Sequence, residues 1–236
     1  MIAGLSRAIT TLLAPLLSLA AFLLILFAYL APTLMLSMQV SLLKVSSSTA
    51  LTSNSTVSSV DGPTIFLGAL GSCSRANNEA TVSCTVPSVS PTYNLSVLPS
   101  NAPDIFDTPT TATPAFIAVS LAFTVVFLFM YTFTAHHAIL GRAGVPFERP
   151  QVQRATAWIG LLGFIIGITS FLIIFMWFTK SVDDFNEDIK KLGSDAPNLI
   201  ATTSNGFVMA WIGYAFYAVP LASSLAKLQV TVGGKA

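Results

Sequence analysis

Charged side chains are scarce in this chain of 236 residues. Asp, Glu, Lys and Arg make up 9% of the sequence, whereas hydrophobic residues make up 53%. A soluble domain carries about 25% charged residues, so the composition excludes an ordinary soluble protein and indicates a membrane protein. The formal net charge is only +1, so no nucleic-acid partner is expected.

The groups that catalysis requires are also missing. No ionisable side chain other than Tyr lies in the long apolar runs, and no Gly-rich phosphate loop, HExxH or Gly-x-Ser-x-Gly motif occurs. General acid–base and metal catalysis need such groups, and ion-coupled transporters usually carry acids or bases within the membrane. We therefore expect no enzyme activity, no catalytic residue, no cofactor and no metal site, and the sequence argues weakly against transport.

Two polar clusters contain residue types that bind metal ions. The adjacent His136 and His137 point about 100° apart on a helix, which favours an interfacial pair over two ligands of one metal. Four acids fall within six residues, at Asp183, Asp184, Glu187 and Asp188. On a helix they do not converge like an ion-binding loop, so a solvated face is favoured.

Four apolar runs without any charged residue are present. A helix that crosses a bilayer needs ~20 predominantly apolar residues, and such runs cover residues 9–36, 114–134, 155–178 and 206–225. They predict an all-α membrane protein with a four-helix transmembrane bundle. The first run exceeds the hydrophobic core of a signal peptide, so we expect it to be retained.

Charges near the spans predict that both termini are cytoplasmic. The short loop between the second and third spans holds three Arg and only one acid, Glu148, as the positive-inside rule requires. Nine of the ten acids then fall outside, as do two sequons that predict glycosylation at Asn54 and Asn94. The raw count of basic residues is nearly even, with six inside and five outside: Arg7, Arg142, Arg149, Arg154, Lys227 and Lys235 against Lys44, Arg75, Lys180, Lys190 and Lys191.

The outer loop at residues 37–113 contains the only two cysteines, Cys73 and Cys84. Segments 39–45, 64–70 and 80–86 have the composition of strands, so we expect a small extracellular β-sheet within this loop. The cysteines would lie at facing strand ends and be oxidised to each other in an oxidising compartment. Gly68 and Gly71 precede Cys73 and are interpreted as backbone devices that let a strand bend into it. Residues 87–114 are rich in proline and predict an extended return to the membrane.

The third span carries two further signals. Gly160, Gly163 and Gly167 form a small-residue face that lets another helix approach closely. Packing within the bundle is favoured over an oligomer interface. After the span, an amphipathic stripe and a stop at Gly193 predict a short outer helix over residues 181–193, which continues the third span beyond the bilayer. The stripe consists of Val182, Phe185, Ile189 and Leu192.

Together, four spans, cytoplasmic termini and the run Gly68-Ala69-Leu70-Gly71-Ser72-Cys73 followed by Cys84 resemble the claudin superfamily. The tryptophans of the claudin motif are absent, and the Ser/Thr-rich loop is more similar to the fungal PalI and eisosome-associated plasma-membrane proteins. The resemblance implies a left-handed four-helix bundle, a small extracellular sheet and a Cys73–Cys84 disulfide. It also implies roles in plasma-membrane domain organisation, cell-wall integrity, endocytosis or ambient-pH signalling.

We therefore expect a non-enzymatic scaffold of the plasma membrane whose partners are the lipid bilayer and other membrane proteins or further copies of itself. The short tail after the fourth span favours a membrane-domain role over signalling. The first alternative is an accessory subunit of a channel, transporter or synthase. The second is a small transporter or ion pathway.

Overall fold

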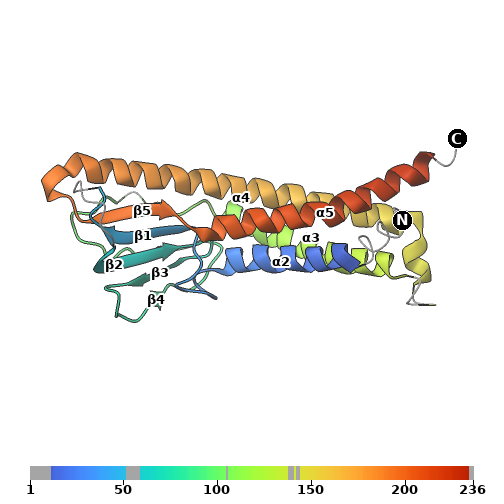
Figure 1. Cartoon of the computed structure of the whole chain (residues 1–236), viewed down its shortest axis with the longest axis horizontal. Coiled ribbons are helices and arrows are strands. Elements are labelled where there is room, and N and C mark those ends of the chain that lie inside the picture. The colour runs from blue at the N-terminus through green and yellow to red at the C-terminus, as the bar shows by residue number, and fades with distance from the viewer. Residues whose placement is uncertain (1–11, 52–58, 105, 138–140, 142–143, 234–236) are drawn as a thin grey trace. The chain divides into compact units, whose positions relative to one another are not determined.

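The computed structural model describes residues 12–51, 59–104, 106–137, 141 and 144–233. Within them, the chain is mostly helical and carries one small antiparallel sheet (Figure 1). The four α-helices are α2 (Ala14–Leu30), α3 (Ala112–Ala135), α4 (Pro150–Leu192) and α5 (Asn205–Gly233). Helices α3, α4 and α5 are long and apolar enough to cross a membrane, and α2 is a shorter apolar helix of 17 residues.

Helix α2 ends at Leu30, six residues before the end that the sequence predicts for the first span, at residue 36. The reason is Pro32, which has no backbone N–H and disfavours helical geometry in the residue before it. The predicted start at residue 9 and the nearby Arg7 lie outside the described residues. Pro220, by contrast, lies inside α5 without ending it, and α5 continues to Gly233, past the predicted end at residue 225.

Helix α4 is a single helix of 43 residues. It contains both the predicted third span and the predicted outer helix without an interruption, and a short 3₁₀ helix, η4 (Gly193–Asp195), follows it. Val182, Phe185 and Ile189 of the amphipathic stripe are buried, whereas Leu192 is exposed. The apolar stripe therefore belongs to the core as far as Ile189.

The sheet contains β1 (Leu43–Ser48), β2 (Ser59–Leu67), β3 (Ser72–Arg75), β4 (Ser83–Cys84) and β5 (Leu199–Thr203). Their order is β4-β3-β2-β1-β5, and every neighbouring pair is antiparallel (Figure 1). Strands β1 to β4 lie in the loop at residues 37–113, where a small sheet was expected, whereas β5 follows α4 and was not predicted. Strand positions also differ from those expected: β1 begins four residues late, at Leu43, and β4 covers only two residues of segment 80–86.

The chain divides into two compact units, which are described separately. The helix unit comprises residues 1–26, 116–169 and 210–236, and the sheet unit comprises residues 27–115 and 170–209. The core of the sheet unit is built from alternate residues of its strands, such as Leu43 and Val45 of β1. Phe106 and Phe185 add an aromatic pair whose ring centroids are 4.8 Å apart.

Candidate functional site

The disulfide joins strand β3 to the edge strand β4. Cys73 of β3 and Cys84 of β4 lie directly opposite in the strand register, and their Cα atoms are 4.0 Å apart. Cys73 is fully buried, while Cys84 lies at the exposed edge strand. The bond therefore ties a two-residue edge strand, which has few ladder hydrogen bonds of its own, to the buried part of the sheet.

Gly68 allows the backbone after α2 to lie directly against the Gly68–Cys84 motif, which is the run from Gly68 to Cys73 followed by Cys84. A Cβ atom at Gly68 would collide with the carbonyl oxygen of Ala31 and with the ring of Pro32. The sulfur of Cys73 lies 3.5 Å from the carbonyl oxygen of Pro32. Gly71 adopts a φ of +153°, and a Cβ there would meet the side chains of Thr33 and Thr85. The sequence indicated a backbone role for both glycines, but it did not show that the turn at residues 31–33 is what they contact.

The proline-rich segment at residues 87–114 is hydrogen-bonded to the same Gly68–Cys84 motif. The Tyr93 hydroxyl donates a hydrogen bond to the carbonyl oxygen of Gly68 over 3.0 Å, and the Asn94 N–H donates to Ser72 Oγ over 2.8 Å. Burial raises the pKa of Tyr93 far above its usual range, so the hydroxyl remains a donor. Tyr93 was not identified from the sequence, because a single Tyr in a proline-rich segment has no distinctive spacing.

Of the two predicted glycosylation sites, the structure describes Asn94 alone, since Asn54 lies outside the described residues. Asn94 is exposed. Its side-chain oxygen accepts hydrogen bonds from the N–H of Ser96 over 3.1 Å and from the Ser96 hydroxyl over 2.6 Å. The sequon thus forms a compact polar turn on the surface of the sheet unit.

One side chain of α4 covers the edge strand β5. Asn186 Nδ2 donates to the carbonyl oxygen of Ala201, and Asn186 Oδ1 accepts from the N–H of the same residue, both over 2.9 Å. An unpaired strand edge invites association with other strands. Asn186 therefore substitutes for a neighbouring strand at this point, which sequence patterns did not indicate because β5 itself was not expected.

The helix unit contains a close helix contact built on three glycines, which we call the glycine seam: Gly160, Gly163 and Gly167. A Cβ atom at Gly160 would lie 2.5 Å from the ring of Phe127 on α3, and one at Gly167 would collide with Ser120 and Tyr214. Two backbone carbonyl groups of the seam act as hydrogen-bond acceptors. Ser120 Oγ donates to Gly163 over 2.7 Å, and the Tyr217 hydroxyl of α5 donates to Gly160 over 3.1 Å. The seam thus contacts α3 and α5 of the same chain.

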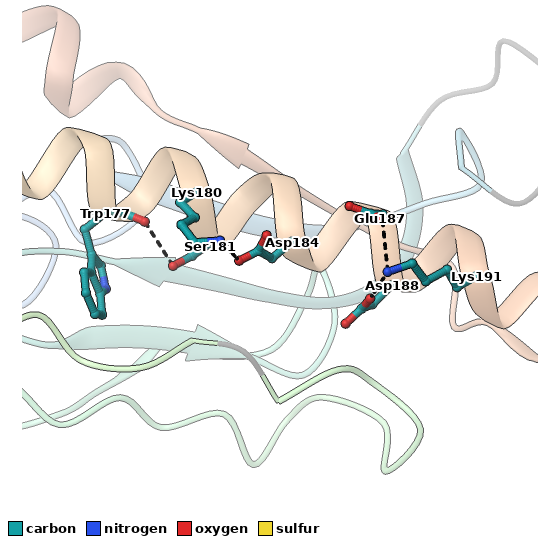
Figure 2. Close-up of polar contacts among 7 residues, drawn as sticks. All are labelled: Trp177, Lys180, Ser181, Asp184, Glu187, Asp188 and Lys191. Atoms are coloured by element: carbon teal, nitrogen blue, oxygen red, sulfur yellow. Dashed lines mark hydrogen bonds and ion pairs between the residues drawn. The ribbon is translucent and has the colours of Figure 1, made fainter.

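Three of the four acids of the α4 cluster, Asp184, Glu187 and Asp188, pair with lysines on the same helix (Figure 2). Lys180 lies 2.8 Å from Asp184, and Lys191 lies 3.0 Å from Glu187 and 3.1 Å from Asp188. The hydrogen bonds that both lysine ammonium groups donate to these carboxylates raise the pKa of Lys180 and of Lys191. All these side chains are solvent-exposed, so the pairs act as a solubilising face and contribute little to stability.

His136 and His137, which directly follow α3, do not converge on a common point. Their Nδ1 atoms face the backbone oxygens of Thr132 and Thr134, at 3.0 and 2.9 Å. His137 Nε2 lies 3.4 Å from Glu148 Oε1. Among the residues that the structure describes, no group of three or more His, Cys, Asp or Glu side chains is placed to hold a metal ion.

No protein-family model matches the chain, and no curated protein shows a significant match to it.

Proposed function

We propose that the protein is a non-enzymatic organiser of the plasma membrane with a claudin-like architecture, both termini cytoplasmic and the sheet extracellular. The observation that carries the proposal is the construction of the sheet unit. The disulfide joins β3 to β4, the Tyr93 hydrogen bond holds the proline-rich segment to Gly68, and Gly68 and Gly71 let the motif lie against the turn after α2. An extracellular element braced in this way suits a protein that positions partners.

The helices supply the surface for lateral contact. Large apolar side chains remain exposed on the helix unit, including Phe129 on α3 and Trp158 on α4, at 56% and 61% exposure. In a membrane these positions face lipid or a neighbouring protein, and helix association there depends on shape rather than on the hydrophobic effect. The family resemblance of the Gly68–Cys84 motif supports the same role.

Photo-crosslinking in intact membranes tests the proposal. A benzophenone amino acid at Trp158 should give discrete protein adducts, whereas the same probe at the fully buried Phe127 should react only within the chain. Native mass measurement after mild detergent extraction then distinguishes the outcomes. Homo-oligomers or several membrane partners support an organiser, and a single stoichiometric large partner would make the chain an accessory subunit instead. A monomer with lipid adducts alone would contradict both.

A further inference from the structure

The segment that follows α2 exposes four large apolar side chains in succession, and we call it the apolar tip: Leu34, Met35, Leu36 and Met38. Their exposed fractions are 56%, 46%, 38% and 51%. The segment is not a helix. It is a series of turns in which the N–H groups of Gln39 and Val40 donate to the carbonyl oxygen of Leu36 over 2.9 and 3.0 Å.

The base of the apolar tip is held on both sides. On one side, Ala31 and Pro32 lie against Gly68, and the sulfur of Cys73 contacts Pro32. On the other, Asn205 Nδ2 donates to the carbonyl oxygen of Gln39 over 2.7 Å, and the Gly206 N–H donates to Ser41 over 2.9 Å. The side chains are therefore exposed on a fixed support rather than on a loose connection.

The backbone within the tip is itself in an unusual conformation. Leu36 has a φ of +56° and is the one residue other than glycine with a positive φ among those the structure describes. Bulky L-residues rarely adopt this left-handed region, and such strain persists only where the surroundings enforce it. Glycine or a polar turn residue would adopt this conformation at lower cost, so the turn geometry alone does not account for Leu at this position.

The position of the tip identifies what covers it. Helix α2 ends at Leu30, just before the tip, and α5, which is long enough to cross a membrane, begins at Asn205, which binds the base of the tip. The tip therefore follows the C-terminal end of α2 directly, and its base is hydrogen-bonded to the N-terminal end of α5. No charged residue occurs between Arg7 and Lys44, so the segment is a continuation of membrane-compatible sequence. Uncharged apolar side chains at that level fit the boundary between headgroups and acyl chains.

We propose that the apolar tip inserts into the lipid headgroup and acyl boundary on the sheet side of the membrane and fixes the height of the sheet unit above the bilayer. The Gly68–Cys73 motif then acts as the support that presents the tip to lipid. This inference concerns lipid contact and does not depend on the lateral partners proposed above. A second copy of the chain is the competing occupant.

The chain suits a direct depth measurement because both of its cysteines form the disulfide. Met35→Cys, labelled with nitrobenzoxadiazole, is reconstituted in phosphatidylcholine vesicles that contain doxyl-labelled lipid. Ser100→Cys is the matched control, because Ser100 is exposed in the same unit beside Asp188 and Lys191 at the far end of α4. We expect blue-shifted emission and several-fold stronger quenching by shallow doxyl lipid at residue 35, with iodide quenching prevailing at residue 100.

Two results would overturn the proposal. Iodide quenching at residue 35 equal to that at residue 100 would show that the tip is in water. Contact with a second copy would give blue-shifted emission of the labelled protein without doxyl quenching. The unlabelled Met35→Cys variant would then form disulfide-linked dimers. A further variant, Met35→Glu, tests the insertion without a label at residue 35. It should move a probe at the neighbouring Met38→Cys towards water while the sheet unit stays folded, as read from its retained disulfide.

Discussion

Gly68 illustrates at the scale of one residue how the motif depends on a missing side chain. The atoms that a Cβ at this position would meet are the backbone oxygen of Ala31 and the ring of Pro32. Neither can rotate away, so we expect Gly68→Ala to lower the free energy of unfolding by about 3 kcal/mol, at the upper end of overpacking effects. Thermal unfolding in detergent measures the loss.

Gly193→Ala provides the control for this substitution. Gly193 has a φ of +59°, and no atom lies within 4 Å of the place a Cβ would take. Alanine there suffers only the left-handed backbone penalty of about 1 kcal/mol. Equal losses for the two variants would show that the close approach of residues 31 and 32 to Gly68 contributes nothing.

The disulfide is the second feature of residue scale, and its effect follows from the short loop that it closes. Cys73 and Cys84 are 11 positions apart, for which the loss of unfolded-state entropy predicts a stabilisation of about 3 kcal/mol. The double variant Cys73→Ser/Cys84→Ser should unfold correspondingly earlier, and adding reductant should not shift its unfolding further. A reductant-dependent shift in the variant would mean that the effect does not come from this bond.

At the scale of an element, β5 depends on a helix for its free edge. Asn186→Ala would leave both the N–H and the carbonyl oxygen of Ala201 without their partner, a loss of about 2 kcal/mol for buried polar groups. Hydrogen exchange should accelerate at Ala201 while β2 keeps its protection. Asn186→Asp retains an acceptor but has no donor. Its hydrogen-exchange rate at Ala201 should lie between those of the unsubstituted protein and of Asn186→Ala. Unchanged exchange at Ala201 in Asn186→Ala would contradict the covering role.

The glycine seam is the corresponding element contact in the helix unit. Gly160→Ala places a methyl group against the ring of the fully buried Phe127, with an expected loss of about 2 kcal/mol from overpacking. Tyr217→Phe removes only the hydroxyl that binds the Gly160 carbonyl, which within a membrane is worth about 0.6 kcal/mol. Unfolding in mixed micelles compares the stabilities of the two variants. Adding Phe127→Leu should partly restore the stability that Gly160→Ala loses. A larger loss of unfolding free energy in Tyr217→Phe than in Gly160→Ala would show that the hydroxyl, and not the close packing at Gly160, dominates the contact.

Elements with a local signal could be predicted from the sequence. The uncharged runs located α3, α4 and α5, and the stripe at Val182, Phe185 and Ile189 indicated that α4 extends past its apolar part. Strand β5 had no such signal, because five residues between two helices acquire their conformation by pairing with β1, more than 150 positions earlier in the chain. The contacts of Gly68, Tyr93 and Asn186 were missed for the same reason, since each joins segments whose approach is set by the sheet.

At the scale of the whole molecule, the pairing of β1 with β5 constrains the topology. Val45 lies opposite Ala201 in the sheet, so the segments before α3 and after α4 must be on the same side of the membrane. Helices α3 and α4 therefore cross together or not at all, and both are long and apolar enough to cross. This geometric constraint is independent of any count of charges, but it does not say which side carries the sheet.

Impermeant maleimide labelling of intact cells decides the side. With the sheet outside, Ser100→Cys should react with the maleimide before permeabilisation. Val145 lies between α3 and α4 and is 56% exposed, and Val145→Cys should react only after permeabilisation. The native cysteines do not compete, because they form the disulfide. In the same cells, Asn94→Gln should remove one glycosidase-sensitive mass step, since its sequon would face the lumen during synthesis. The reverse labelling order would place the sheet in the cytoplasm, where disulfides are rarely kept, and would overturn both the orientation and the extracellular role.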